Sequence, residues 1–408
     1  MTRPAIVLAA AACAALVASC APAPRHAPAA TSTGNVLFVG TTHGIAAVRP
    51  ADGSVAYSVA GGVAAPDWSV LYRTTPAGSG TTVTALAPDG STRWSEQVDG
   101  HLGVKLAAPG GATVVLGPRY SGTGRPRTDL VVGRMGIARP AFRTFHVPGN
   151  VEPEAMSLDG STLFLIEYVP AMHPTGYLLR RLELASGDLG DVRRVDEDET
   201  GVMHAVARTH VMARDGSRLY TLYTVPGRRA FVHVLDLRDK YAHCVDLPLP
   251  FGTGPQSAVA LTLTHDGSRL FVADRHSGAT AVIDTAQLVI DSTGTVPMAG
   301  SGGPAGAVLG IDGTLYLASG RHLVSVLPMS LDYQRAVSLP GTATAVGLGP
   351  SGEVVAGLSH GGGLVFVDPV TGRTTAHLRS SAFDGIQFIG AVAAAPLDQA
   401  RTTMQCAC

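Results

Sequence analysis

The sequence predicts an all-β fold, a β-propeller built from four-stranded antiparallel blades. Short runs rich in Val, Ile, Leu and Phe alternate with turn residues along the chain, and residues 258–290 hold three such runs separated by tight turns. Almost no segment has the spacing of an amphipathic helix. One sheet of this kind has exposed edges and two apolar faces, so it needs copies of itself to be buried.

The turn residues between the first two strands of each unit return at intervals of about 40 to 55 residues, a period typical of propeller blades. A stacked pair of sheets would not give so regular a spacing. Seven markers and an incomplete first unit predict eight blades, with seven as the alternative because the second and third units are irregular. The markers are Asp67-Trp68, Gly110-Gly111, Asp159-Gly160, Asp215-Gly216, Asp266-Gly267, Asp312-Gly313 and Ser351-Gly352.

The expected strands follow from these apolar runs and their turns. They are 35–40, 44–49 and 54–59 in the first unit; 69–74, 81–87 and 91–98 in the second; 103–108, 112–116, 129–133 and 141–147 in the third; 154–158, 162–168, 177–184 and 190–195 in the fourth; 210–213, 218–223, 230–237 and 242–247 in the fifth; 258–265, 270–274 and 279–284 in the sixth; 304–311 and 314–318 in the seventh; and 345–348, 353–358 and 363–367 in the eighth.

The first unit lacks an innermost strand, and residues 386–395 (IQFIGAVAAA) form an apolar run without companions. Pairing this run with the first unit would join the two ends of the chain and leave no gap in the ring. We therefore expect the propeller to span residues 34–396, followed by a polar tail over 397–408.

The composition excludes several classes of protein. Of the 408 residues, 46% are hydrophobic and only 15% are charged, and the net charge is -1. A chain so weakly charged is neither a disordered tail nor an electrostatic binder of nucleic acid. The 49 glycines and 27 prolines are spread along the chain, as many short strands joined by turns require.

The N-terminus has the pattern of a targeting segment. Arg3 precedes the apolar run 5–17, and the small residues Val17-Ala18-Ser19 lead to Cys20. This resembles a bacterial lipoprotein signal peptide, which implies removal of residues 1–19, acylation of Cys20 and anchoring to the cell membrane outside the cytoplasm. An ordinary secretory signal is the alternative. Residues 20–33, rich in Pro and Ala, then act as a flexible tether.

Three stretches carry a resemblance to known propellers. Residues 266–290 (DGSRLFVADRHSGATAVIDTAQLVI) resemble the YVTN and surface-layer repeats of lactonase-like propellers, and residues 85–94 (ALAPDGSTRW) and 365–374 (VFVDPVTGRT) resemble quinoprotein repeats. Residues 214–248 are similar to segments of actinobacterial propeller proteins. These families share an architecture and not one function, so the resemblance implies the fold only.

A lactonase-like propeller would gather acidic, amide and imidazole groups at the central channel, where oxygen ligands can hold a divalent metal. We expect the loops that enter the innermost strands to supply such groups, with solvated loop residues as the other interpretation. Catalytic candidates are Glu152, Glu154 and His204, and ligand-binding candidates are Asn150, Arg208, Gln256 and Asp384. No cofactor is predicted, and a divalent metal is left open.

Two other patterns point to packing or turns rather than chemistry. A quinone cofactor needs stacking aromatics, but Trp94 falls at the outer-strand position that joins neighbouring blades, and Trp68 is the only other tryptophan. Residues 357–361 fit G-x-S-x-G and 360–363 fit HGGG, yet a β-hairpin is expected there instead of the strand-to-helix turn that a nucleophile elbow requires. The acidic run 196–199 is interpreted as a solvated loop.

Cysteines are sparse beyond the N-terminal segment. Cys244 could pair with Cys406 or Cys408 in an oxidising compartment, and one thiol would remain. Cys406 and Cys408 could also act as soft-metal ligands, although two thiolates alone make a poor site. The sequence does not decide between these pairings.

Taken together, the pattern favours a monomeric binding or scaffold protein at the cell envelope, held to the membrane through Cys20. Its expected partners are an envelope protein, a glycan or a small ligand, and not nucleic acid. The alternatives are a metal-dependent lactonase-like hydrolase and a quinone-dependent dehydrogenase.

Overall fold

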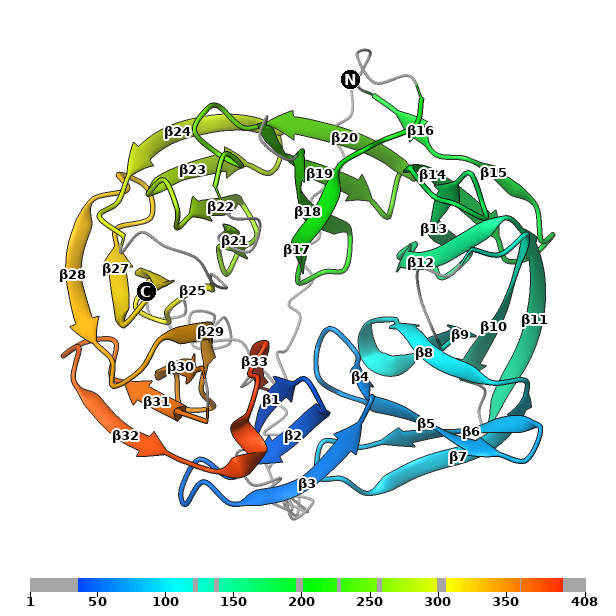
Figure 1. Ribbon diagram of the computed structural model, residues 1–408, viewed down its shortest axis with the longest axis horizontal. Helices are drawn as coiled ribbons and strands as arrows, with labels where there is room; N and C mark the ends of the chain where they lie inside the picture. The colour runs from blue at the N-terminus through cyan, green and yellow to red at the C-terminus, as the bar shows by residue number, and fades with distance from the viewer. Residues whose placement is uncertain are drawn as a thin grey trace, which may run out of the picture. The chain divides into compact units, whose positions relative to one another are not determined.

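The structure is a computed structural model, and it describes residues 36–119, 124–135, 139–195, 201–225, 229–254, 259–298, 306–359 and 361–391. The chain divides into two units, Met1–Thr33 and Gly34–Cys408. The second unit is an eight-bladed β-propeller, with its sheets arranged around a central axis (Figure 1). The predicted fold class and the count of eight blades are confirmed.

Each blade is an antiparallel sheet whose innermost strand faces the axis. Blade 1 contains β1 (Leu37–Thr41), β2 (Gly44–Val48), β3 (Val55–Ala60) and β33 (Phe388–Ala391); blade 2 contains β4 (Val63–Ala64), β5 (Leu71–Ala77), β6 (Gly80–Leu86) and β7 (Thr92–Asp99); blade 3 contains β8 (Leu102–Ala107), β9 (Thr113–Pro118), β10 (Arg127–Met135) and β11 (Pro140–Pro148); blade 4 contains β12 (Asn150–Met156), β13 (Thr162–Val169), β14 (Gly176–Glu183) and β15 (Leu189–Asp191).

The second half of the ring repeats this order. Blade 5 contains β17 (Val206–Met212), β18 (Arg218–Val225), β19 (Arg229–Asp236) and β20 (Tyr241–Asp246), with β16 (Arg193–Arg194) added at its outer edge; blade 6 contains β21 (Val259–Leu263), β22 (Arg269–Asp274), β23 (Ala279–Asp284) and β24 (Val289–Thr295); blade 7 contains β25 (Ala307–Leu309), β26 (Leu315–Ser319), β27 (His322–Val326) and β28 (Tyr333–Ser338); blade 8 contains β29 (Ala343–Leu348), β30 (Val354–Leu358), β31 (Gly363–Val367) and β32 (Thr374–Leu378). The described helices are two short 3-10 turns, η1 (Pro109–Gly111) and η2 (Ser381–Phe383).

The ring closes as predicted, because β33 from the C-terminal end pairs with β1 from the N-terminal end. Leu37 lies opposite Ala391 and Gly40 opposite Phe388. Gly40 leaves room for this pairing, since a Cβ there would meet the Phe388 ring at 2.1 Å. The closing strand begins at Phe388 rather than at 386, and the described residues follow it to Ala391.

Three predicted strands need correction. β12 begins at Asn150 rather than at 154, and β17 begins at Val206 rather than at 210. Pro153 and the two glutamates interrupt the apolar pattern in β12, and Arg208 interrupts it in β17. An innermost strand tolerates Pro153 because one of its edges faces no further strand. The predicted strand 190–195 is split, because β15 belongs to blade 4 whereas β16 pairs in parallel with β20 of blade 5.

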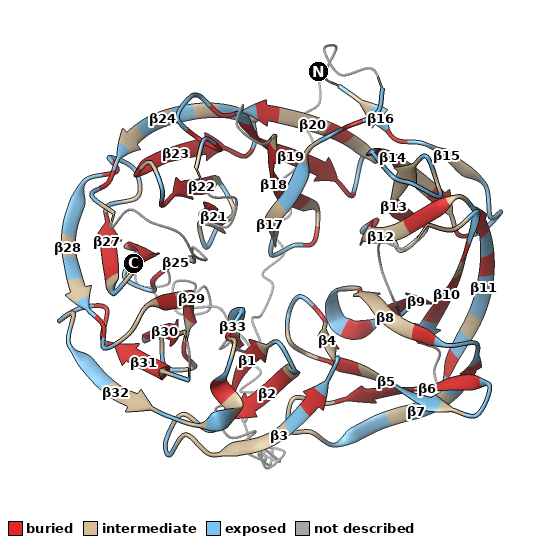
Figure 2. Cartoon of the chain, viewed as in Figure 1, coloured by how far each residue is buried: buried red, intermediate tan, exposed pale blue. Residues whose placement is uncertain are grey.

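The core consists of apolar layers between neighbouring blades. The middle strands are buried on both faces, as in β23 and β31, whereas outer strands such as β24 and β28 alternate exposed and half-buried residues. Figure 2 shows this change from buried middle strands to exposed outer strands. Trp94 on β7 contacts Phe142 on β11 of the next blade at 6.1 Å between ring centroids, which confirms its predicted role.

On the face that carries the marker hairpins, side chains of one blade donate hydrogen bonds to backbone carbonyls of the next. Tyr57 donates to Pro88 O at 2.8 Å, Tyr72 to Gly111 O at 2.8 Å, His265 to Gly310 O at 3.1 Å and Tyr316 to Pro369 O at 2.9 Å. Arg134 and Arg218 likewise donate to Gly160 O and Thr285 O. Burial raises the pKa of all three tyrosines to about 12, so they stay protonated and keep donating.

Among the helices in the described part of the chain, none is long and apolar enough to cross a membrane.

Candidate functional site in the channel wall of blades 3 to 5

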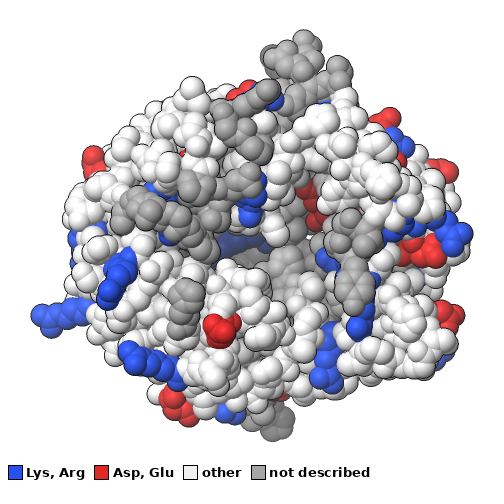
Figure 3. Space-filling view, viewed as in Figure 1, with Lys and Arg blue, Asp and Glu red and all other residues white. Residues whose placement is uncertain are grey.

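Charged residues occur on the innermost strands of only three consecutive blades. β8, β12 and β17 carry them, whereas β4, β21, β25, β29 and β33 contain only apolar residues, glycine and threonine. Figure 3 shows a hollow in the middle of the ring with acidic and basic atoms on its wall. Among the described innermost strands, charge is therefore confined to blades 3 to 5. The charged residues on these strands are Lys105, Glu152, Glu154 and Arg208.

Three of these residues sit on β-bulges. The register skips Lys105 in β8, Glu154 in β12 and Arg208 in β17, so each is an extra residue without a partner on the next strand. A bulge redirects side chains and is frequent near functional sites. In β12 it reverses the alternation: Val151 packs between blades 3 and 4, whereas Ala155 packs between blades 4 and 5.

Glu152 is held by two cations from blade 3. Its carboxylate lies 3.0 Å from Lys105 Nζ and 2.5 Å from Arg125 Nη2, and the three side chains are only 11–12% exposed. Arg125 also donates to Thr128 Oγ1 and to Val151 O, which fixes its guanidinium. Glu152 is therefore a fixed, neutralised carboxylate rather than a free acid or base.

Glu154 has a different environment. Its Oε1 atom lies 3.5 Å from the Tyr223 hydroxyl of blade 5, and its Oε2 atom is buried without a hydrogen-bond partner. Burial raises the pKa of Glu154 to about 7, and the bond from Tyr223 only partly opposes this. Near neutral pH the side chain can thus hold or release a proton.

Tyrosines surround this carboxyl group. The Tyr177 and Tyr223 rings stack at 5.7 Å, and Tyr223 stacks on Phe231 at 5.4 Å. Burial raises the pKa of Tyr168, and the negative charges of Glu152 and Glu154 add to the effect. The pKa of Tyr223 is raised well above 10, again mainly by burial and then by Glu154. These two hydroxyls therefore remain donors near neutral pH.

Arg208 presents an incompletely paired cation on the neighbouring blade. Its Nε atom donates to Thr224 Oγ1 at 2.7 Å, and its Nη2 atom is buried without a hydrogen-bond partner. Burial lowers the pKa of Arg208. A guanidinium with an unmatched donor binds carboxylates and phosphates well, because its N–H groups match their geometry.

The remaining predicted site residues lie apart from this cluster or outside the described residues. Asn150 is fully buried at the start of β12 and donates to Ala171 O at 3.2 Å. His204 is exposed before β17, and its Nδ1 donates to Thr175 O at 2.9 Å instead of contacting either glutamate. Asp384 is exposed ahead of β33, on blade 1. Gln256, Cys20, the run 196–199, Cys406 and Cys408 lie outside the described residues, as does the Pro304 region.

The described residues do not fit a divalent metal at the two glutamates. No group of three or more His, Cys, Asp and Glu residues gathers anywhere in the described ranges in the way metal ligands do. Two cations already neutralise Glu152, and Glu154 is half protonated near pH 7. Both properties disfavour binding of a hard cation.

Two other sequence patterns have structural roles: Trp68 packs between blades, and residues 357–361 belong to a β-hairpin. Trp68 stacks on Phe38 with 5.0 Å between centroids, at the junction of blades 1 and 2. β30 and β31 pair directly, with Leu358 opposite Gly363, so the G-x-S-x-G segment spans a hairpin as predicted. His360 itself lies outside the described residues.

Sequence reasoning missed Lys105, Arg125, Tyr168 and Tyr223. The sequence does indicate Lys105 and the two glutamates in one way, because each is a charged residue within a short strand that also contains apolar residues. Arg125 and Tyr223 reach the glutamates from 27 and 69 residues away along the chain. Such distant contacts depend on how the blades pack, and no local pattern indicates them.

Comparisons with known proteins agree on the architecture. No family model and no curated protein sequence matches the chain. Among solved structures, the dihydro-heme d1 dehydrogenase NirN aligns with a TM-score of 0.51 and 14% identity over 88% of this chain and 76% of NirN. The periplasmic gluconolactonase PpgL of Pseudomonas aeruginosa gives 0.46 and 19% over 89% and 99%. The Kuenenia stuttgartiensis hydrazine synthase gives 0.44 and 16% over 86% and 93%. The match to NirN, at 14% identity, supports a shared fold alone.

Proposed function

We propose that the protein is a lipid-anchored binding protein outside the cytoplasm, and that its channel wall at blades 3 to 5 binds a small polar ligand. The observation that carries this proposal is the restriction of charge to three consecutive innermost strands. The rest of the described inner wall is apolar or small. An uneven wall of this kind orients a ligand, because only one side of the channel offers ionic and hydrogen-bonding groups.

The chemistry of the wall favours a hydroxy acid. Arg208 Nη2 is a buried donor without an acceptor, which suits a carboxylate. Glu154 Oε2 is likewise unmatched, and near neutral pH its carboxyl group can either donate to or accept from a hydroxyl. The Glu152 ion-pair cluster beside them is fixed and would limit the ligand's position.

The direct test is a thermal unfolding screen of the full chain with L-tartrate, citrate, D-gluconate and L-glutamate. A ligand that binds only the folded state raises the midpoint in proportion to its occupancy. We expect at least one hydroxy acid to raise the midpoint while L-glutamate does less, and we expect the compound to be recovered unchanged. If none of the four shifts the midpoint at millimolar concentration, the ligand class proposed here is wrong.

A metal-independent hydrolase is the second candidate, and one observation favours it. A carboxyl group with a pKa of about 7 beside a channel is suited to general acid–base catalysis. In that case δ-gluconolactone would be hydrolysed by the full chain without added metal, and Glu154→Gln would abolish turnover. Glu96→Gln, in the outer strand β7 of blade 2, is the control. Binding without turnover favours the first candidate.

The anchor proposal has its own test. Cells expressing the full chain would incorporate radiolabelled palmitate into the protein, and Cys20→Ala would lose the label and shift the protein from the membrane to the soluble fraction. Label that survives Cys20→Ala would contradict acylation at this residue.

A further inference from the structure

A pocket of about 350 Å³ lies on the face of the propeller that carries the marker hairpins. The first hairpins of blades 3, 4 and 5 converge there. The three hairpins touch at Gly216 of blade 5, which has a φ of 70°. A Cβ on Gly216 would lie 3.3 Å from Pro109 of blade 3 and 3.5 Å from Leu158 of blade 4. The pocket is thus formed by rigid turns of three blades, separate from the ionic cluster that the proposed function uses.

The lining combines apolar side chains with a polar rim. Leu106 and Met156 come from innermost strands of blades 3 and 4, Met212 from that of blade 5, and Met135 and Leu158 lie at the rim. Met135 is 40% exposed and Leu158 46% exposed, so part of the apolar lining faces solvent. Three of the nine methionines in the chain therefore meet in one pocket, and methionine adapts its shape to varied apolar ligands.

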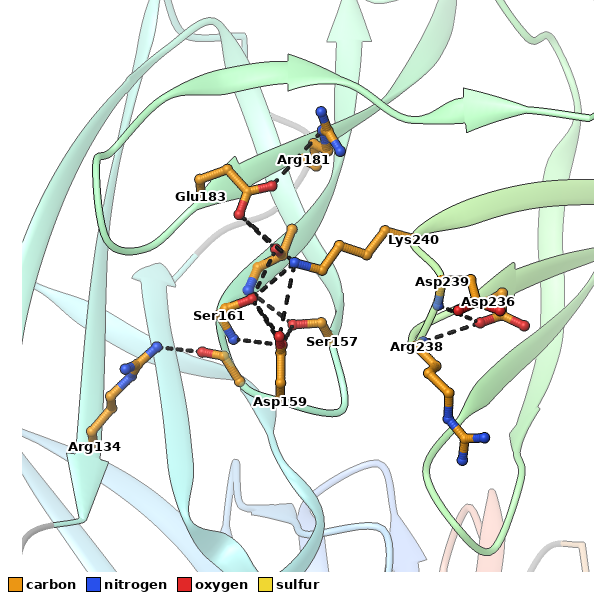
Figure 4. A network of polar contacts seen from close by, with 12 residues as sticks. Arg134, Ser157, Asp159, Ser161, Arg181, Glu183, Asp236, Arg238, Asp239 and Lys240 are labelled. Carbon is orange, nitrogen blue, oxygen red and sulfur yellow. Dashed lines mark hydrogen bonds and ion pairs between the residues drawn. The ribbon is translucent and has the colours of Figure 1, made fainter.

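The polar groups around the pocket already have partners within the protein (Figure 4). Asp159 accepts from Ser157 Oγ at 2.6 Å and from the Ser161 amide at 2.9 Å, and Lys240 donates to Ser161 Oγ at 2.9 Å. Arg134 donates to Gly160 O. Asp159 is ionised at all ordinary pH values, because these hydrogen bonds lower its pKa to about 2.

Two consequences follow for the occupant. Asp159 and Arg134 both hydrogen-bond within the protein and carry opposite charges, so the rim offers no net charge that would favour a charged ligand. The volume is at the lower end of the range for small-molecule pockets, about 300 to 1,000 Å³, which suits a compact molecule better than a peptide segment.

We propose that this pocket between the hairpins of blades 3, 4 and 5 binds a small uncharged apolar molecule, such as a ring system or a short hydrocarbon. The ligand would displace water from the methionine and leucine side chains and leave the polar rim unchanged. The proposal is independent of the channel ligand.

The test is a titration of the full chain with the uncharged dye N-phenyl-1-naphthylamine, whose fluorescence rises in apolar surroundings. Two variants address the pocket: Leu158→Asp places a charge at the rim, and Ala112→Trp fills the space from an exposed lining position. Leu249→Asp is the matched control, because Leu249 is 72% exposed and lies outside the pocket. Thermal unfolding and sedimentation velocity accompany each titration.

We expect saturable binding by the full chain at one site, a loss of at least tenfold in affinity for both pocket variants, and an unchanged affinity for Leu249→Asp. A variant that no longer unfolds cooperatively is set aside, and the other pocket variant decides. The proposal is overturned if dye binding does not saturate, if Leu249→Asp weakens binding as much as Leu158→Asp, or if both folded pocket variants bind normally. It is also overturned if the full chain dimerises and Leu158→Asp makes it monomeric, since a second copy would then occupy the pocket.

Discussion

Glu154 differs from Glu152 because β12 contains one residue more than its partner strand. The bulge turns Glu154 toward blade 5, where it meets Tyr223 and apolar side chains instead of cations. Glu152 instead pairs with Lys105 and Arg125, and these cations offset the cost of burying its carboxylate. Two acids on one strand thus acquire different roles from different surroundings.

This difference predicts a pH dependence of stability. The pKa of Glu154 is raised from 4.5 to about 7 in the folded protein, so the folded state binds a proton that the unfolded state has released over this range. The free energy of unfolding therefore falls as pH rises from about 4.5 to 7, by roughly 3 kcal/mol from this group. Glu154→Gln should flatten this part of the profile in urea unfolding measured from pH 4.5 to 8.

The control for this profile is Asp99→Asn, which removes an exposed acid at the end of β7. It should leave the slope between pH 4.5 and 7 as it is in the full chain. An unchanged slope in Glu154→Gln would mean that Glu154 ionises at its ordinary pH, and the argument from burial would be wrong.

A second prediction concerns the Glu152 ion pairs. Glu152→Gln leaves Lys105 and Arg125 nearly buried without their counter-charge, so the free energy of unfolding should fall by about 3 kcal/mol. Urea unfolding at pH 7 measures this. The control Asp191→Asn removes the acid of an ion pair with Arg180, and since the Asp191 side chain is 82% exposed, it should cost less than about 1 kcal/mol. Equal losses would show that burial of the Glu152 cluster contributes little.

At the scale of strands and hairpins, blades are joined by side chains that reach the next blade's turns. Tyr72 of blade 2 donates to Gly111 O, and Gly111 adopts a positive φ of 67° with no room for a Cβ beside Val70. Such bonds connect sheets that share no backbone ladder. Among the described residues, six blade junctions have such a bond on the face of the marker hairpins: 1–2, 2–3, 3–4, 5–6, 6–7 and 7–8. Each bond contributes a modest gain in stability.

Removing one of these hydroxyls should therefore have a measurable effect. Tyr72→Phe keeps the ring in the core and deletes the bond to Gly111 O, so we expect the free energy of unfolding to fall by about 1 to 2 kcal/mol. The matched control is Tyr333→Phe on the outer strand β28, where the tyrosine is 46% exposed. Denaturant unfolding that gives the same value for both variants would contradict a role for the bond.

The same scale shows what the sequence could and could not predict. Middle strands were predictable because they are buried on both faces and read as continuous apolar runs, as in β23. Innermost strands such as β12 and β17 were placed too late, since Pro153 and Arg208 break that pattern at the bulges. The candidate residues Glu152, Glu154 and Arg208 were expected on loops that enter the innermost strands, whereas they lie on those strands. Their partners depend on packing between blades, which no local pattern indicates.

At the scale of the whole molecule, the ring is closed by only one strand. β33 pairs with β1, and Phe383 and Ile386 just before it are buried against blades 1 and 8. Without this segment, blade 1 would expose an edge and its junction with blade 8 would open. The closing strand was predictable because it was an apolar run left over after the repeats were counted.

Deleting residues 386–408 should lower the thermal unfolding midpoint by roughly 10 °C or more and raise the binding of apolar dyes. Deleting only residues 397–408 should leave the midpoint unchanged, because this truncation keeps all of the described strand β33, which pairs with β1. Differential scanning calorimetry of both truncations tests the closure. Equal midpoints for the two truncations would show that β33 does not hold the ring together.

Charge is distributed unequally among the innermost strands that surround the channel, and the proposed binding role depends on this difference. Arg208 and Thr344 occupy the same kind of position, each an extra residue on an innermost strand, but on blades 5 and 8 respectively. Arg208 lies in the charged part of the wall, whereas β29 around Thr344 carries no charge.

The most direct test is therefore isothermal titration calorimetry of one hydroxy acid, the compound from the unfolding screen, against three proteins: the full chain, Arg208→Met and Thr344→Val. We predict that Arg208→Met weakens binding at least tenfold and that Thr344→Val leaves it within about twofold, with both variants folded at the temperature of the titration. Equal affinities for all three proteins, or a larger loss from Thr344→Val, would contradict binding at the charged wall of blades 3 to 5.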